Sequence, residues 1–471
     1  MSTTGTEVDV KRVFALQKDN QPRILATGAE ERIRKLKRLA GAIERRTPDL
    51  LEVLRADLGR PATEAILTEI FPVATEIRHA CRNLRKWMRP VRVSAPLVFL
   101  GSRNEIRYQP KGVVLVMAPW NFPFQLAVGP LVSAIAAGNS IVLKPSELSE
   151  HTSRFLRELV ADIFDEPEVT VIEGDATVAQ ALLELPFDHV FFTGSPAIGK
   201  VVMAAAAKNL TSVTLELGGK CPVMVDASAD LASVARKVAW GKFVNAGQIC
   251  LAPDYVLVPQ ERVGAFAGEL RRFVEKQYGS LDALASNPDY GRIINDRHWR
   301  RLKELFDSAI GRGARVALGG VFGPSRFISP TVLTDVPLDS DLMQDEIFGP
   351  LLPIVGYRDL DEAIRVINER PRPLALYVFG RDRGMTERLL TDVPAGDTVV
   401  NDVLVHFANV ALPFGGQRTS GLGKSHGYHG FKAFSHERGV MTQPRRTLME
   451  IFYPPYTERA RKLASLVSRH L

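Results

Sequence analysis

The residues best suited to chemistry are Cys250, which ends the small-residue segment 245–250, and Glu216, which opens the segment Glu-Leu-Gly-Gly-Lys. A cysteine thiolate is a strong nucleophile, and a carboxylate can act as a general base. Together they are the two protein groups needed to oxidise an aldehyde through a covalent thioester. Most isolated cysteines are instead buried and inert, so this interpretation requires a cofactor site and an oxyanion hole elsewhere in the chain.

Asn121 is the candidate for the oxyanion hole. It lies between prolines in Pro-Trp-Asn-Phe-Pro, residues 119–123, directly after an apolar run. A side-chain amide held in this way can donate a hydrogen bond to a developing oxyanion. The same amide could equally satisfy the backbone of its own turn, so both roles stay open at this point.

A phosphate-binding turn is indicated by Gly194, Ser195 and Gly199, where an apolar segment ends and a helical segment begins. The N-terminus of a helix presents unpaired N–H groups and partial positive charge, which suit a pyrophosphate. The spacing is G-x-x-x-x-G and not the usual G-x-G-x-x-G, so a purely structural turn explains it about equally well.

Lys144 and Glu147 follow another apolar run and could both hydrogen-bond the hydroxyls of an adenosine ribose. A carboxylate at this place favours NAD, because it repels the 2′-phosphate of NADP. A rotated Glu147 would also admit NADP. The alternative is a surface ion pair on a turn before a helix.

The elements that must position these residues alternate between strand and helix. Short apolar runs, typical of strands buried on both faces, occur at 112–117, 140–143, 169–172, 189–192 and 213–215. Helical segments at 126–137, 150–164 and 176–185 lie between them. This spacing predicts a doubly wound parallel sheet.

A second alternation follows the glycine pair at 218–219. Strands are predicted at 222–225, 255–258, 352–355, 377–379 and 398–400, with helices at 231–245 and 360–368. The predicted fold class is therefore α/β, with two doubly wound parallel-sheet domains.

Composition sets further bounds. The chain has 471 residues, of which 45% are hydrophobic and 24% charged, as in a soluble globular protein of two or three domains. No apolar run is long enough to span a membrane, and Met1–Lys11 lacks the apolar core of a signal sequence. Three cysteines predict a reducing, cytoplasmic location without a disulfide framework or metal site, and Cys81 and Cys221 are interpreted as packing residues.

Much of the net charge of +7 is concentrated in residues 441–471. The segment 457–471 has the spacing of an amphipathic helix with a basic face. A helix packed on the body of the protein is the favoured interpretation; peripheral contact with anionic lipid, or a gate over a substrate channel, is the less favoured one. No nucleic-acid-binding motif accompanies the charge.

Taken together, these motifs resemble the aldehyde dehydrogenase superfamily, and most closely its class 3 branch of fatty and aromatic aldehyde dehydrogenases, including bacterial enzymes of the coniferyl aldehyde type. The matching motifs are PWNFPF (119–124), LKPSE (143–147), FTGS (192–195), LELGGK (215–220), GQICLAPD (247–254) and EIFGP (346–350). Class 3 features are WGKF (240–243), YGRII (290–294), PLALY (373–377) and FSH (434–436). The matches run in the expected order from about residue 36 to 456.

The resemblance implies a role for each matching residue. Cys250 would be the nucleophile, Glu216 the base for the hydrolytic water, and the Asn121 amide with the Cys250 N–H the oxyanion hole. The substrates would be hydrophobic aldehydes, either aromatic or medium- to long-chain aliphatic. The NAD or NADP cofactor would be held by Trp120, Lys144, Glu147, Gly194, Ser195, Gly199, Leu217, Glu346 and Phe348.

The resemblance also implies a division of the chain. Residues 1–89 and 110–216 would form the NAD(P)-binding domain, 217–403 the catalytic domain, and 441–471 a tail. Residues 90–109 and 404–440 would form a bridging element, in which a hairpin near 90–109 and 404–415 mediates a homodimer.

Two other functions are considered. In a CoA-acylating aldehyde dehydrogenase a thiol would replace water, which would leave Glu216 without a role. A non-catalytic, membrane-associated scaffold would not need Cys250, Glu216 and Asn121 together. Ile249 stands where many relatives have a polar residue, and the tail has no hydrophobic anchor like that of the fatty-aldehyde enzymes.

Overall fold

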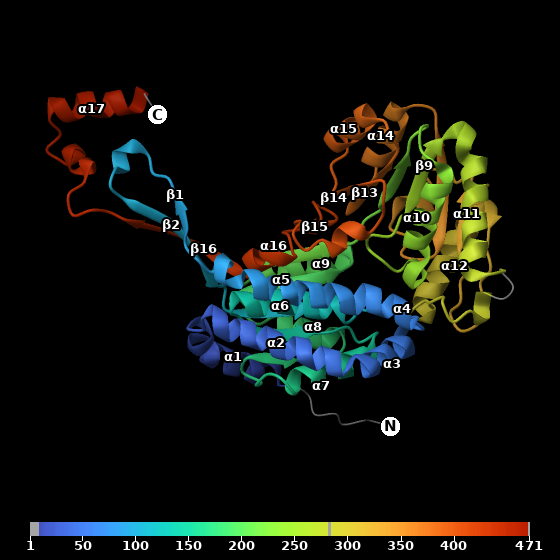
Figure 1. Ribbon diagram of the computed structural model, residues 1–471, viewed down its shortest axis with the longest axis horizontal. Helices are drawn as coiled ribbons and strands as arrows, with labels where there is room; N and C mark the ends of the chain where they lie inside the picture. The colour runs from blue at the N-terminus through green and yellow to red at the C-terminus, as the bar shows by residue number, and fades with distance from the viewer. Residues whose placement is uncertain (1–8, 281–283, 470–471) are drawn as a thin grey trace.

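A computed structural model describes residues 9–280 and 284–469 and arranges them around three sheets (Figure 1). Two large sheets form the body, and a three-stranded sheet projects from it as an arm. The body has the α/β class predicted from the sequence. Most of the N-terminal segment Met1–Lys11, which was expected to lack a signal core, lies outside the described residues.

The first large sheet is parallel apart from one short edge strand. Its strands are β3 (Val113–Met117), β4 (Ser140–Lys144), β5 (Val169–Val171), β6 (His189–Gly194), β7 (Ser212–Leu217) and β15 (Gly421–Leu422), in the order β15-β7-β6-β3-β4-β5. Only β15 is antiparallel to its neighbour. The five parallel strands coincide with the predicted apolar runs, because strands covered on both faces are apolar throughout.

Helices cover both faces of this sheet. Along β3, Val114 and Val116 pack with one set of helices, whereas Val113 and Leu115 pack with the other. The first set is α2 (Ala29–Arg45), α3 (Thr47–Leu58), α5 (Phe71–Trp87), α6 (Gln125–Ala137) and α7 (Glu150–Ala161); the second is α1 (Val10–Leu25), α8 (Ala176–Leu183) and α9 (Pro196–Ala207). The short α4 (Ala62–Ala65) and a π-helical turn η1 (Ile66–Ile70) join α3 to α5.

The second large sheet has the order β10-β11-β12-β9-β8-β13-β14. Its strands are β8 (Pro222–Val225), β9 (Tyr255–Pro259), β10 (Arg315–Leu318), β11 (Thr331–Thr334), β12 (Leu351–Tyr357), β13 (Ala375–Phe379) and β14 (Asp397–Val400). Its helices are α10 (Leu231–Phe243), α11 (Val263–Tyr278), α12 (Asp296–Gly311), α13 (Asp341–Gln344), α14 (Leu360–Asn368) and α15 (Arg383–Asp392). β10 and β11 were not predicted: β10 is an antiparallel edge strand whose first two residues are exposed.

The arm pairs β2 (Arg103–Pro110) with β1 (Val91–Val93) on one side and β16 (Ser435–Thr442) on the other. The expected hairpin partner, residues 404–415, is therefore wrong, since that segment lies in the body and includes a 3-10 turn at Val405–Ala408. The helix α16 (Gly427–Ala433), which packs on α5 and α6, leads from the body into β16.

The predicted basic helix forms as α17 (Glu458–Arg469), but it does not pack on the body as expected. It lies beside the arm and contacts the turn η7 (Leu448–Phe452), with only Ala460 buried (Figure 1). No helix within residues 9–280 and 284–469 combines the length and apolar character needed to cross a membrane.

Candidate active site

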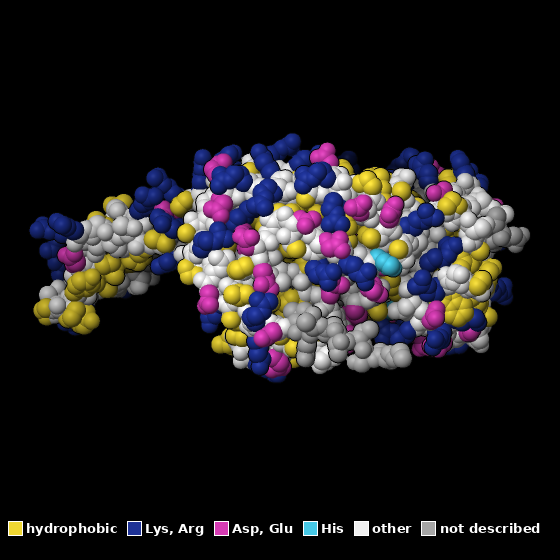
Figure 2. Space-filling view, turned by 90° about the horizontal axis from the view of Figure 1, so that it is seen from below, with side chains coloured by type: hydrophobic (Ala, Val, Ile, Leu, Met, Phe, Trp, Pro, Cys, Tyr) yellow, Lys and Arg dark blue, Asp and Glu magenta, His cyan; other side chains and the backbone are white. Residues whose placement is uncertain are grey.

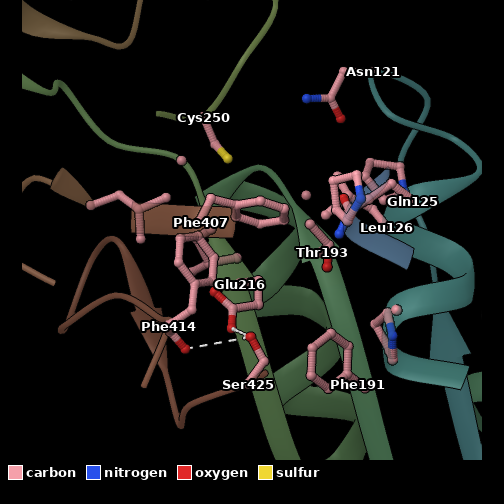
Figure 3. A pocket seen from close by; sticks show the side chains of 18 of the residues that line it. Asn121, Gln125, Leu126, Phe191, Thr193, Glu216, Cys250, Phe407, Phe414 and Ser425 are labelled. Atoms are coloured by element: carbon pink, nitrogen blue, oxygen red, sulfur yellow. Dashed lines mark hydrogen bonds between the residues drawn. The ribbon is translucent and has the colours of Figure 1, made fainter. Parts of the chain in front are cut away.

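One cavity of about 290 Å³ lies where the two large sheets meet, and it collects most of the predicted site residues (Figure 3). Those that line it are Trp120, Asn121, Gly194, Ser195, Glu216, Leu217, Cys250, Glu346 and Phe348. Three predicted cofactor residues, Lys144, Glu147 and Gly199, do not line this cavity. The three predicted catalytic side chains therefore share one hollow with the residues expected to bind the nicotinamide end of the cofactor.

Cys250 is held by a loop with an unusual backbone. After α10, Asn245 and Ala246 adopt left-handed conformations with φ of 50° and 49°, and Gly247 follows at 75°. A Cβ on Gly247 would lie 2.4 Å from the carbonyl oxygen of Gly349, so only glycine allows the two loops to approach. The backbone beneath is also fixed, because the Cys221 thiol donates to the Cys250 carbonyl at 3.4 Å. Cys221 is thus a packing residue that also supports the candidate nucleophile.

A buried ion pair fastens the far end of the same loop. Lys220 Nζ lies 2.5 Å from Asp254 Oδ2 and donates to the carbonyl oxygens of Leu342 and Asp345. The other oxygen of Asp254 accepts from the N–H of Ile347 at 3.0 Å. The segment carrying Cys250 and the segment carrying Glu346 are therefore tied to each other and to the start of β8.

The electrostatics of Cys250 favour the thiol in this state. Burial raises its pKa above the ordinary value, and the carboxylates of Glu346 and Glu216 raise it further. Hydrogen bonds from the N–H groups of Cys250 and Leu251 act in the opposite direction. This environment therefore favours the neutral thiol of Cys250 over the thiolate.

Asn121 sits on a buried polar network. Its Nδ2 donates to the carbonyl of Gln248 at 3.0 Å, two residues before Cys250. The backbone carbonyl of Asn121 accepts hydrogen bonds from the Arg60 guanidinium and from Asn245 Nδ2. Arg60 is 1% exposed, lies over the Phe122 ring at 4.6 Å and pairs with Glu69. The candidate oxyanion donor is thus positioned by the segment between α3 and α5.

That segment also anchors the two neighbouring elements. Glu69 Oε2 accepts from the N–H of Gln125 at 2.7 Å, at the start of α6, and Glu64 Oε1 accepts from the N–H of Asn245 at 2.9 Å. Burial raises the pKa of both carboxyls to about 7, against the attraction of Arg60. One cluster therefore holds the oxyanion turn, the start of α6 and the nucleophile loop.

Glu216 lies in β7, opposite Gly421 of β15. Ser425 Oγ donates to Glu216 Oε1 at 2.8 Å, whereas Glu216 Oε2 is buried without a partner among the described residues (Figure 3). Burial raises the pKa of Glu216 to about 8, while the Ser425 hydrogen bond lowers it. Such a carboxyl is poised to gain and lose a proton near neutral pH.

Predicted cofactor residues lie at the carboxyl ends of two strands of the first sheet, β4 and β6. Lys144 Nζ, at the end of β4, lies 3.4 Å from Glu147 Oε2. At the end of β6, Ser195 Oγ accepts from the N–H of Ile198 and caps α9. A Cβ on Gly194 would lie 2.5 Å from the Phe192 ring, and one on Gly199 2.7 Å from Leu217, so packing also demands both glycines.

The residues at this edge fit a nicotinamide dinucleotide. Within the described chain, Thr193 Oγ1 and Glu346 Oε1 are buried without a hydrogen-bond partner, and both side chains line the cavity. Buried polar atoms in this state destabilise a protein unless a ligand satisfies them, and ribose hydroxyls and amides are suitable ligands. Phe348, with its ring 5.3 Å from that of Trp120, adds an apolar surface.

Several site residues escaped the sequence analysis. Arg60, Glu69 and Ser425 act through contacts with residues 56 to 209 positions away, and no local spacing reveals them. Phe407 and Phe414, in the wall of the cavity, belong to the segment that was assigned to the arm. In residues 9–280 and 284–469 no group of three or more His, Cys, Asp or Glu side chains is placed to hold a metal ion.

Comparison with known proteins matches this geometry to one family. The profile described as "Aldehyde dehydrogenase family" matches residues 2–440. The chain is 46% identical to the putative aldehyde dehydrogenase AldX of Bacillus subtilis, over 92% of this chain and 98% of that one. It is 43% identical to a probable coniferyl aldehyde dehydrogenase of Pseudomonas aeruginosa, over 92% and 91%.

Solved structures agree. The substrate-bound AldH of Staphylococcus aureus has a TM-score of 0.93 and 40% identity, covering 97% of this chain and 99% of that one. Betaine aldehyde dehydrogenase from Staphylococcus aureus, solved with NAD+, has a TM-score of 0.85 and 26% identity, covering 94% and 88%.

Fold and comparisons together define an α/β oxidoreductase that uses a nicotinamide cofactor. The chain belongs to the aldehyde dehydrogenase family. It is an NAD(P)-dependent enzyme that acts on small aldehydes, and the comparisons give no support to a CoA-acylating enzyme or a scaffold.

Proposed function

We propose that this enzyme oxidises hydrophobic aldehydes, aromatic or medium- to long-chain aliphatic, to carboxylic acids, with Cys250 as nucleophile, Asn121 as oxyanion donor and Glu216 as base. The observation that carries the proposal is the shared cavity: these three side chains line it together with apolar walls that include Leu126, Phe407 and Phe414. Apolar walls favour apolar substrates by removing their surface from water.

The residues act in sequence. The Cys250 thiolate adds to the aldehyde carbon, and hydrogen bonds from the Asn121 amide and the Cys250 N–H stabilise the oxyanion of the thiohemiacetal. A nicotinamide cofactor held in the cavity would supply the hydride acceptor, so that collapse of this oxyanion with loss of hydride leaves an acyl-thioester on Cys250. Glu216 then takes a proton from water, which attacks the thioester and releases the acid and the Cys250 thiol. The unpartnered Oε2 of Glu216 is the atom available to accept that proton.

Cofactor binding extends over Trp120, Lys144, Glu147, Gly194, Ser195, Gly199, Leu217, Glu346 and Phe348 in this proposal. Lys144 and Glu147 would hydrogen-bond the adenosine ribose, and the capped N-terminus of α9 would face the pyrophosphate. Glu147 favours NAD over NADP for the reason given above. The parallel strands of the first sheet and the strands of the second support the proposed domain division, 1–89 with 110–216 and 217–403, although β15 of the first sheet comes from residues 421–422.

Replacement of the nucleophile tests the proposal. Cys250→Ala should lower aldehyde-dependent formation of reduced cofactor by at least about 10³-fold, because the covalent route is lost. Cys81→Ala is the matched control: it removes a thiol on α5 that lies outside the cavity and should leave the rate within about twofold of the parent. Full turnover by Cys250→Ala with an aldehyde and NAD would refute covalent catalysis.

We also infer that two copies associate through the arm. In the sheet of the arm, Val93 is paired with Asn104, and Asn104 is paired with Met441 on its other side. Paired residues lie on the same face of a sheet, and so do residues two apart along a strand. One face of the arm therefore carries Val91, Val93, Ile106 and Met441. Val91, Val93 and Met441 are each more than 40% exposed, and Figure 2 shows hydrophobic side chains gathered along the arm. The opposite face carries Glu105 between Arg103 and Arg107. An apolar face of this kind is stabilised when a second copy covers it.

A cytoplasmic location is proposed from the three free cysteines, which suit a reducing compartment. The basic helix α17 keeps peripheral contact with anionic lipid as a less favoured alternative. Sedimentation with anionic liposomes is compared between the full chain and a chain ending at Tyr456. Equal recovery of both chains in the supernatant supports a cytoplasmic location without lipid contact through α17.

A further inference from the structure

Two backbone N–H groups next to the Cys250 sulfur have no carbonyl partner. Burial raises the pKa of the thiol, while hydrogen bonds from the N–H of Cys250 and the N–H of Leu251 lower it. Within residues 9–280 and 284–469 neither N–H donates to a carbonyl oxygen of the backbone. The strength of these two donors therefore bears directly on how well the site stabilises a thiolate, or the oxyanion formed from an aldehyde.

The strength of each donor depends on the carbonyl of its own peptide unit. A hydrogen bond accepted by the carbonyl polarises the unit, and its N–H becomes a stronger donor. The peptide that carries the Leu251 N–H has the carbonyl of Cys250, and the peptide that carries the Cys250 N–H has the carbonyl of Ile249. Groups that bond these two carbonyls can therefore tune the two donors.

Cys221 bonds the carbonyl of Cys250. Its thiol donates to this carbonyl at 3.4 Å, and its sulfur accepts from the N–H of Ala375, at the start of β13, at 3.3 Å. Cys221 is completely buried and does not line the cavity. A chain of hydrogen bonds therefore runs from the backbone of β13 through Cys221 and the Cys250–Leu251 peptide to the nucleophilic sulfur.

Tyr377, two residues further along β13, reaches the carbonyl of Ile249 through one more peptide. Its hydroxyl donates to the Leu251 carbonyl at 2.7 Å, and the N–H of the same peptide, on Ala252, donates to the Ile249 carbonyl at 3.0 Å. Tyr377 is completely buried, and burial raises the pKa of its hydroxyl, so the hydroxyl keeps its proton and acts as the donor. This second chain ends on the N–H of Cys250.

Both chains start from a rigid element and end in an irregular loop. β13 is buried at every residue and is paired on one side with β8 and on the other with β14. The segment 248–252, by contrast, belongs to no helix or strand. A loop held by a buried strand keeps its N–H groups in a fixed direction, which is the condition for stabilising charge without reorganisation.

We propose that Cys221 and Tyr377 are positioning residues for the nucleophile: Cys221 orients and strengthens the N–H of Leu251, and Tyr377 does the same for the N–H of Cys250. This rests on the proposed function, in which Cys250 attacks the aldehyde and its N–H binds the oxyanion. Neither side chain touches the substrate, because each acts through the peptide that it bonds. Loss of either hydrogen bond should make the thiol less acidic.

Alkylation of Cys250 by iodoacetamide tests the proposal without an aldehyde. The rate is followed by mass spectrometry of the peptide that contains Cys250, from about pH 6 to about pH 9, because the thiolate is the reactive form. Tyr377→Phe and Cys221→Ala should each lower the rate about threefold at every pH, which is the effect of weakening a donor to the thiolate. Cys221→Ser keeps a donor at this position and should stay within about twofold of the parent.

Tyr357→Phe is the matched control. The Tyr357 hydroxyl, in β12 of the same sheet, is also buried and donates to the Val225 carbonyl at 2.8 Å, which lies in β8 and not in the nucleophile loop. This variant loses a similar hydrogen bond and should alkylate within about twofold of the parent. Equal slowing in Tyr357→Phe and Tyr377→Phe would show a general loss of packing and overturn the proposal.

Other outcomes also decide the matter. The parent's rate in Tyr377→Phe or in Cys221→Ala overturns the proposal, and so does Cys221→Ser if it is as slow as Cys221→Ala. With an aldehyde and NAD, the Tyr377→Phe variant should lower kcat about threefold or more with little change in KM, since the donor acts on the transition state. Full turnover by Cys250→Ala would instead refute the proposed function, and the alkylation rates do not depend on that result.

Discussion

The body and the arm of this protein are both built on sheets, but the central strands of the body are buried whereas those of the arm are largely exposed. In the body, β3, β4, β9 and β13 are buried at every residue, whereas all residues of β1 and six of the eight in β16 are exposed. Buried polar groups in the body form specific contacts, as in the Arg60–Glu69 cluster beneath Asn121. Burial and hydrogen bonds thus fix the residues of the site, whereas the arm keeps an exposed apolar face that the proposed second copy would cover.

The largest effect is expected at Glu216, the most consequential buried charge. Glu216→Gln keeps the acceptor for Ser425 but removes the base, so steady-state turnover should fall by about 10²–10⁴-fold. The acyl-thioester should then accumulate, and a single burst of reduced cofactor in stopped-flow measurements would report it. Unchanged turnover would contradict a role in hydrolysis.

The pH dependence sharpens this test. With the pKa of Glu216 raised to about 8, the carboxylate form is lost as the pH falls below that value, so hydrolysis-limited turnover should fall about tenfold per unit below it. Ser425→Ala removes a hydrogen bond that lowers this pKa, and should shift the profile to higher pH. Identical profiles for the parent and Ser425→Ala would exclude Ser425 as a positioning residue.

The next prediction compares the loss of stability when a buried ion pair and an exposed ion pair are broken. Arg60→Met leaves Glu69 buried without its cation and frees the Asn121 backbone, so unfolding in urea should show a loss of about 3–5 kcal/mol. The control, Arg85→Met, breaks an exposed pair with Glu30 and should leave the urea midpoint of unfolding close to that of the parent. Equal losses would contradict the view that burial sets the strength of these contacts.

The smallest effect on catalysis is expected in the arm. Val93→Asp places a charge in the exposed apolar face and should convert a dimer into monomers, as measured by light scattering after size-exclusion chromatography. The kcat/KM per site should stay within about twofold, because no described arm residue lines the cavity. Arg438→Ala, on the opposite face, is the control and should keep the dimer. A monomeric parent would refute the dimer.

The sequence predicts what depends on local pattern. The five parallel strands of the first sheet and the helix α14 coincide with their predictions, because buried parallel strands are continuously apolar and an amphipathic helix has a periodic apolar face. β15 has two residues and β16 is polar and exposed, so neither leaves such a signature. The same limit applies to the site. Cys250 and Glu216 lie in recognisable motifs, but Ser425 reaches Glu216 only because β15 pairs with β7 in the folded chain.

The pairing of β15 with β7 also orders events during synthesis. Gly421 is paired with Glu216, and Ser425, four residues later, donates a hydrogen bond to the Glu216 carboxyl. Residues near the C-terminus therefore complete the surroundings of this carboxyl. A ribosome-bound chain that has not yet released this segment carries β7 as an open sheet edge, the kind of surface that chaperones shield. The proposed base, Glu216, therefore reaches its final environment only after residues 421–425 have been synthesised.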